Sequence, residues 1–269
     1  MPTVAILADI HSNFPALEAV LRDVEQCGAE RIVFLGDIVG YGGSPAECVN
    51  LVRKMGGACV MGNHDVEIDK VRKRGCTFRD ADWKCCEYQA GLAHSARCLD
   101  ADQAQWLSAL PFRMKLPGAI AAHGSLDEPE AFNYIKDVKS ASPTLEILRK
   151  EKSKVGFFGH THEQGIFVED AAGLEWLDET RVKVPVGWAC AVTVGAVGRP
   201  RDPERRAAWV LWDPGSGVVD FRKTDYNRLQ AAHDIMLAKL PIASALALLT
   251  AAEVVELPMT EDESGSHLS

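Results

Sequence analysis

The sequence predicts an α/β fold built around a parallel sheet, and three observations support this prediction. Five short apolar runs, each bounded by glycine or polar residues, are typical of buried strands. Segments with helical spacing of apolar residues separate the first three runs, which predicts right-handed crossovers between parallel strands. Each run is followed by residues able to bind a metal, as expected where strands end at a ligand site. The runs are residues 4–8, 32–36, 58–62, 119–122 and 155–159.

The first sixty residues predict two helices between three strands. Asn13 is suited to cap the first helix, and Gly28 is suited to end it. Between them, one apolar face is formed at helical spacing by Leu17, Val20, Leu21 and Val24. After the second run, residues 40–45 predict a loop, and residues 46–55 predict the second helix.

The remainder predicts a helical insertion, a second sheet and C-terminal helices within one domain of residues 1–256. Residues 66–110 are charged and helical in spacing, so we expect an insertion over the sheet edge near the site. Residues 141–151 predict another crossover helix, and residues 224–256 predict C-terminal helices before a polar tail at 257–269. A second, mostly antiparallel sheet is expected from residues 165–168, 174–177, 189–194, 207–212 and 218–221.

Composition narrows the classes of function. The formal net charge of −9 disfavours binding to extended nucleic acid, and with it a nuclease. No signal peptide is evident at the start, and no apolar stretch is long enough to span a membrane. Eight scattered cysteines without a C-x-x-C pair favour reduced thiols, so we expect a cytoplasmic protein. An apolar face near residues 242–249 is compatible with a homodimer.

The residues after the five runs predict a site for two metal ions. In an extended segment, residues two apart point to the same side, so Asp9 and His11 can bind one ion together. Asp37 has two carboxylate oxygens and can bridge. Oxygen and imidazole ligands without thiolate favour Mn, Fe, Zn, Co or Ni. The residues in question are Asp9, His11, Asp37, Asn63, His64, Asp65, His123, His160 and His162.

This set of ligands predicts metal-dependent hydrolysis of phosphate esters. Two ions about 3.5–4 Å apart acidify a bridging water and neutralise phosphoryl oxygens, so a metal-bridging hydroxide is the expected nucleophile. His64 is left over after the ligands are assigned, and we expect it to protonate the leaving oxygen or stabilise phosphoryl charge. Asp65 is expected to hold the orientation of His64. The alternative for His64 is indirect support of a metal ligand.

These motifs resemble the signature of the calcineurin-like metallophosphoesterases, in its usual order. They are Asp9-Ile10-His11, Gly36-Asp37, Gly62-Asn63-His64-Asp65, His123-Gly124 and Gly159-His160-Thr161-His162. The longer strings around Asp9, Asp37 and His123 are similar to a small prokaryotic branch that is itself similar to diadenosine tetraphosphatases and serine/threonine phosphatases. The resemblance covers about residues 3–222.

The resemblance implies a four-layer α/β/β/α sandwich, with mixed central sheets flanked by helices, and a dinuclear site. It assigns one metal to Asp9, His11, Asp37 and His162. It assigns the other to Asp37, Asn63, His123 and His160, and it gives His64 the leaving-group role. The branch often carries Asn-Pro-Gly-Ser-Val-Gly before Pro-Arg, whereas residues 193–201 here lack that amide and hydroxyl.

Four residues are candidates for substrate binding. Arg199 and Arg201 are candidate phosphate contacts, and we favour Arg201 because it follows Pro200 and precedes Asp202, which could orient it. Tyr134 could stack on a base, and Asn13 is the remaining candidate. The expected substrate is a small phosphorylated molecule or a phosphoprotein, with phosphomonoesters, phosphodiesters and dinucleoside polyphosphates all open.

A second class of function is a non-catalytic, metal-binding interaction scaffold. The same fold serves as such in a retromer subunit, so architecture alone does not decide between the two. The intact ligand set and the additional His64 favour catalysis, because a scaffold has no need of a titratable group beside two metals.

Overall fold

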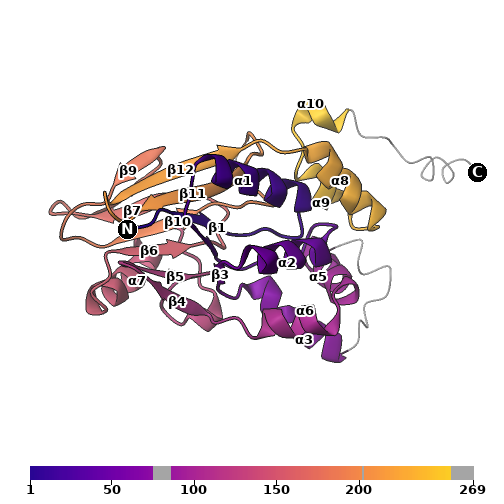
Figure 1. The fold of residues 1–269 in the computed structure, drawn as a ribbon, viewed down its shortest axis with the longest axis horizontal. Coiled ribbons are helices and arrows are strands. Elements are labelled where there is room, and N and C mark those ends of the chain that lie inside the picture. The colour runs from indigo at the N-terminus through magenta and orange to yellow at the C-terminus, as the bar shows by residue number, and fades with distance from the viewer. Residues whose placement is uncertain (75–85, 202, 256–269) are drawn as a thin grey trace, which may run out of the picture.

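The computed structural model describes residues 1–74, 86–201 and 203–255, and these form two six-stranded sheets packed face to face between helical layers (Figure 1). Apolar side chains from both sheets fill the space between them, among them Ile6 and Val33 from one and Phe157 and Val192 from the other. This confirms the four-layer α/β/β/α arrangement.

The first sheet has the strand order β3-β2-β1-β11-β12-β9. Its parallel part is β1 (Val4–Leu7), β2 (Arg31–Phe34) and β3 (Ala58–Cys59). Its antiparallel part is β11 (Ala207–Asp213), β12 (Val218–Thr224) and β9 (Arg181–Lys183).

The second sheet has the order β4-β5-β6-β10-β7-β8. The parallel strands β5 (Ala119–Ala122), β6 (Val155–Phe158) and β10 (Cys190–Val194) lie at its centre. The antiparallel strands β4 (Arg113–Leu116), β7 (Gln164–Glu169) and β8 (Leu174–Leu177) complete it.

The mixed central sheets that the resemblance implies are confirmed, but the division by local pattern into one parallel and one mostly antiparallel sheet is wrong. The first three apolar runs lie in one sheet and the last two in the other, and both sheets are mixed. The runs were recognised because each strand is buried, but burial does not specify a strand's pairing partner. β4 and β9 were not predicted because both are short and carry exposed basic residues.

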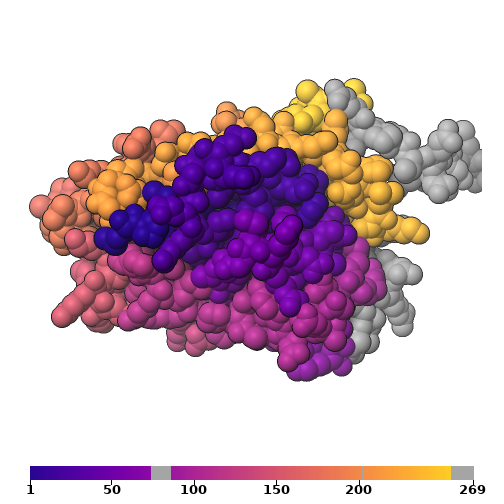
Figure 2. Space-filling model, in the orientation of Figure 1, coloured from indigo at the N-terminus to yellow at the C-terminus, as the bar shows by residue number. Residues whose placement is uncertain are grey.

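Helices cover both outer faces. α1 (Phe14–Gln26), α2 (Pro45–Met55) and α8 (Arg228–Leu237) pack on the first sheet, and α7 (Val138–Lys150) packs on the second. The short helices α9 (Ile242–Leu246) and α10 (Ala251–Val254) follow Pro241 and Thr250. The space-filling view shows α1 and α2 between the C-terminal segments and the insertion (Figure 2).

The insertion begins earlier than expected. α3 (Asn63–Arg74) starts at Asn63 itself, within the third motif, and is followed by α5 (Glu87–Cys98) and α6 (Ala101–Ser108). α3 packs on α5 and α6, and α5 reaches α2 (Figure 1). The motif therefore lies on the first turn of a helix, which changes the directions of its side chains. A short 3₁₀ helix (Pro129–Ala131) precedes α7.

Some expectations fall partly outside the described residues. Cys76, Cys85 and the expected tail at 257–269 lie outside them. The six cysteines within the described part are free thiols. Among the helices that the structure describes, none has both the length and the apolar character needed to cross a bilayer.

Candidate metal centre

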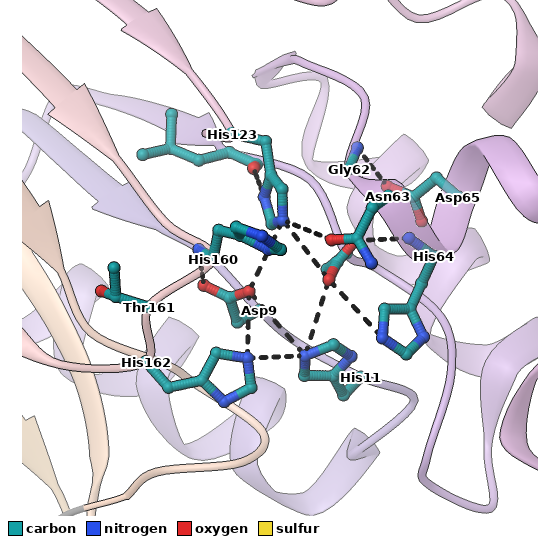
Figure 3. A network of polar contacts seen from close by, with 12 residues as sticks. Asp9, His11, Gly62, Asn63, His64, Asp65, His123, His160, Thr161 and His162 are labelled. Carbon is teal, nitrogen blue, oxygen red and sulfur yellow. Dashed lines mark hydrogen bonds and ion pairs between the residues drawn. The ribbon is translucent and has the colours of Figure 1, made fainter. Parts of the chain in front are cut away.

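The candidate ligands meet where β1, β2, β5 and β6 end and α3 begins (Figure 3). The two sheets approach closely there. A Cβ placed on Gly159 would lie only 2.7 Å from both Ala8 Cβ and Asp9 Oδ2. A side chain at position 159 would therefore push the β6 loop away from the β1 loop. Glycine keeps the ligands of the two sheets within reach of each other.

The ligand loops are not extended, which corrects the geometry assumed from the sequence. Left-handed φ angles of 47° to 66° occur at Asp9, His11, Asp37, His160 and His162. Such angles cost on the order of 1 kcal/mol for a non-glycine residue, and they concentrate at functional sites. Tight turns, not continued strands, therefore bring Asp9 and His11 to one centre. The β1 and β2 loops hold each other through a 2.9 Å bond from His11 N to Asp37 O.

Each of the two carboxylates has one oxygen held by the backbone and one facing the cluster. His160 N donates to Asp9 Oδ2 at 2.9 Å, and His64 N donates to Asp37 Oδ1 at 2.8 Å. Asp9 Oδ1 is buried and has no hydrogen-bond partner among the described residues. Asp37 Oδ2 lies 3.4 Å from His123 Nε2. A bridge by Asp37 would therefore use Oδ2 alone, not both oxygens.

Backbone carbonyls fix the tautomers of three imidazoles. A carbonyl oxygen can only accept, so the ring nitrogen beside it must carry the proton. In the neutral ring the other nitrogen, Nε2, then keeps a lone pair, which is the form that binds a metal. The Nδ1 atoms of His11, His123 and His162 lie 3.2, 2.6 and 2.8 Å from the carbonyl oxygens of Val39, Leu35 and Arg199, respectively.

The imidazole nitrogens and side-chain oxygens converge in a way that suits bound cations. His11 Nε2 and His162 Nε2 are 3.0 Å apart, and neither carries a proton to share in these tautomers. His123 Nε2 faces Asn63 Oδ1 at 3.2 Å and Asp37 Oδ2 at 3.4 Å. Burial disfavours a charge on this ring, but the Asp37 carboxylate outweighs it and raises the pKa of His123 to about 9, so the ring itself carries a proton where no metal replaces it. The contact between the His11 and His162 lone pairs is unfavourable unless a proton or a metal ion lies between them. The residues therefore fit bound metal ions.

The possible ligand atoms fall into overlapping groups, each within 4.8 Å. One group is Asp9, His11 and His162, and a second is Asp37, His123 and His160. This division agrees with the one the resemblance implies, and the assignment of each ligand stays a prediction. A third group contains His11, Asp37 and His64, so His64 also lies within ligand distance of the centre.

His64 is held by packing. Its ring lies 4.7 Å from His11, 4.7 Å from Tyr41 and 4.5 Å from Tyr88, measured between centroids. Its Nδ1 has no hydrogen-bond partner within the described part of the chain, and a Cβ on Gly40 would come within 2.1 Å of it. Burial lowers the pKa of His64 to about 4, so the ring is neutral at pH 7.

Asp65 does not orient His64, which corrects the expectation. Its carboxylate accepts hydrogen bonds from the backbone N–H groups of Ile38 at 3.0 Å, Val39 at 3.4 Å and Gly62 at 3.0 Å. Adjacent residues on a helix do not face each other, so Asp65 points back to the β2 loop while His64 points to the metal centre. Burial raises the pKa of Asp65 to about 7. Asp65 thus joins the loops after β2 and β3.

Comparison with known proteins identifies the family. The family model of calcineurin-like phosphoesterases matches residues 2–164, which include every candidate metal ligand. The chain belongs to this family. An uncharacterized protein of Methanocaldococcus jannaschii is 28% identical over 248 residues, covering 88% of this chain and 93% of that protein.

Solved structures agree with the fold of this phosphoesterase. A metallophosphoesterase from Sphaerobacter thermophilus is 29% identical with a TM-score of 0.78, covering 92% of this chain and 98% of that one. A hypothetical protein from Pyrococcus horikoshii has a TM-score of 0.72 at 22% identity, covering 93% and 98%. A putative diadenosine tetraphosphatase has a TM-score of 0.52 at 20% identity, covering 84% and 95%.

Two of the four candidate substrate residues have other contacts in this phosphoesterase. Asn13 is 3% exposed, accepts from Ala16 N at 3.1 Å and donates to Gly198 O at 2.9 Å. It caps α1 and braces the Gly198 turn, so it is not free to bind substrate. Tyr134 stacks on His160 at 3.8 Å, and Lys136 Nζ lies 4.0 Å from the same ring centroid. Stacking on a base would require Lys136 to move.

The structure reverses the preference between the two arginines. Arg201 is exposed, its side chain has no ion pair among the described residues, and Asp202 lies outside them. Arg199 instead lies over the Tyr41 ring at 4.0 Å and pairs with Glu87 at 2.6 Å. Because Tyr41 packs on His11, the Arg199 guanidinium lies beside the metal centre.

Three residues at the centre were missed from the sequence. Tyr41 stands in the Gly40-Tyr41-Gly42 loop just after Asp37, and that proximity could have identified it. Glu87 and Tyr88 come from α5, which carries no recognisable motif. Only the packing of the insertion brings them to His64 and Arg199.

Proposed function

We propose that this phosphoesterase uses two transition-metal ions to hydrolyse phosphate esters of small molecules or phosphoproteins. The convergence of imidazole lone pairs and carboxylate oxygens on one buried cluster carries this proposal. The nitrogen and oxygen ligand set suits Mn, Fe, Zn, Co or Ni. Such ions, when bound, supply the Lewis acidity that activates water and neutralises phosphoryl oxygens.

The chain itself supplies the remaining chemistry. His64 Nε2 lies 3.9 Å from Asp37 Oδ2, so a phosphoryl group held at the metal centre would be within reach of the imidazole. We assign to His64 a hydrogen bond to the phosphoryl group, which the neutral ring can donate, or the transfer of a proton to the leaving oxygen, which requires the protonated ring that a bound phosphate anion favours. The ring is held between aromatic neighbours and is therefore oriented before substrate binds.

Arg199 is the preferred phosphate contact in this proposal. Its guanidinium is stacked on Tyr41 beside the metal centre, and such a fork suits bidentate binding of phosphate oxygens. Glu87 pairs with it and also accepts from Ser244 Oγ at 3.0 Å, which ties α5 and α9 to the guanidinium. Glu87 thus limits where Arg199 can move.

Hydrolysis of 4-nitrophenyl phosphate by the Mn²⁺-loaded protein tests the proposal. We expect turnover that is lost on chelation and restored by Mn²⁺, and lost in Asp9→Asn because an inward ligand oxygen is removed. Bis(4-nitrophenyl) phosphate and a dinucleoside tetraphosphate, assayed in parallel, distinguish the substrate classes. A wild-type protein that binds metal yet turns over none of the three would instead support the interaction scaffold.

A further inference from the structure

Tyr88 lies at the metal centre on the side formed by the insertion. It occupies the first turn of α5, and its ring meets the His64 ring at 4.5 Å and 63°. Its ring is also 6.4 Å from that of Tyr41, so the two tyrosines stand around His64. Tyr88 is half-buried, and neither the metal ligands nor the proposed role of Arg199 accounts for its hydroxyl.

The hydroxyl of Tyr88 lies beside a candidate metal ligand. The side-chain amide of Asn63 and the carboxylates of Glu67 and Asp37 are near enough to act on its charge. A phenol has a pKa of about 10 and is therefore protonated at neutral pH. The hydroxyl can therefore donate a hydrogen bond.

The direction of the Asn63 contact leaves this hydrogen free. Asn63 Oδ1 faces His123 Nε2 at 3.2 Å, on the metal side. The Asn63 NH₂ group is then the part of the amide left to face Tyr88, and it can only donate to the phenol oxygen. Such a donation is compatible with the amide oxygen facing the metal centre. Its own hydrogen is not used in that contact.

We propose that Tyr88 is a further substrate-contacting residue, whose hydroxyl donates a hydrogen bond to a nonbridging oxygen of the phosphoryl group. The inference rests on the proposed function and names the part of the insertion that recognises the phosphoryl group itself. Nonbridging oxygens bear charge throughout phosphoryl transfer, and neutral donors fixed in a site stabilise such charge without reorganisation. The donor acts on the transferred group and not on the leaving group.

Tyr88→Phe isolates the hydroxyl, because phenylalanine keeps the ring that packs on His64. A hydrogen bond to a charged group corresponds to roughly a 10- to 100-fold effect. We expect kcat/KM to fall by about that factor, equally for esters with good and poor leaving groups. Metal content should not change. Tyr226→Phe is the matched control: it removes another buried hydroxyl, which has no hydrogen bond to a candidate ligand among the described residues, and should leave kcat/KM unchanged.

Binding of inorganic phosphate to the Mn²⁺-loaded proteins gives a readout that does not depend on turnover. Calorimetry should show weaker phosphate binding in Tyr88→Phe than in wild type and Tyr226→Phe. Phosphate affinity and kcat/KM equal to wild type would overturn the proposal. So would a loss of metal that accounts for the loss of activity, since Tyr88 would then only hold Asn63. If wild type hydrolyses no ester, the proposed function fails, while the phosphate measurement still decides the role of Tyr88.

Discussion

Replacing His64 with asparagine is expected to reduce turnover far more than metal content. The imidazole is 3% exposed and packs on three rings, so its position is defined before substrate binds. Losing a general acid typically costs about 10²- to 10⁴-fold in rate. That factor corresponds to roughly 2.7–5.4 kcal/mol in the activation barrier.

The structure makes the metal measurement essential to this test. His64 Nε2 is 3.9 Å from Asp37 Oδ2, and His64, Asp37 and His11 together could hold an ion. kcat should be measured for a series of aryl phosphates, with metal content determined on the same samples. His233→Asn, an exposed histidine on α8, serves as the control and should be nearly silent.

The dependence on the leaving group separates the roles open to His64. If the imidazole protonates the leaving oxygen, the loss should shrink for 4-nitrophenyl phosphate, whose leaving group needs little protonation. A uniform loss across the series would refute that role and point to stabilisation of phosphoryl charge. Loss of metal in proportion to activity would refute both roles and make His64 a ligand.

Two further predictions follow from corrected contacts. Asp65→Asn should lower the free energy of unfolding by about 2 kcal/mol in a denaturant titration, because an NH₂ group would face a buried backbone N–H. A change in the leaving-group dependence without lost stability would contradict this. Arg199→Lys should raise KM about tenfold at constant metal content, because a bidentate contact is lost, while Arg201→Lys should be nearly silent. The reverse order would restore Arg201 as the phosphate contact.

The fold class and the gathering of the ligands could be predicted because each rests on local pattern. A buried strand followed by a ligand is visible in sequence at Asp9, Asp37 and His160, and the strands do end at one centre. Which strands pair was not predictable, because every run is buried and buried strands look alike. The return of β11 to pair with β1 depends on contacts far apart in the chain.

The detailed contacts of the centre could not be read from spacing. The sequence interpretation placed Asp65 on His64 because they are neighbours, but a helix beginning at Asn63 turns them apart. Arg201 was preferred as the phosphate contact because it follows the rigid Pro200. In the structure it is Arg199 that reaches Tyr41 and Glu87, which belong to two other segments of the chain. Contacts between distant segments leave no signal in one sequence.

Metal analysis of Asp37→Asn tests the central claim most directly. Asp37 belongs to two of the possible ligand groups, and its single inward oxygen faces His11 at 3.7 Å and His123 at 3.4 Å. Wild type purified with Mn²⁺ should contain about two equivalents of metal, as should Asp102→Asn, whose carboxylate is on the surface. Asp37→Asn should lose most of both. Full occupancy in Asp37→Asn would contradict the shared-ligand centre on which the proposed function depends.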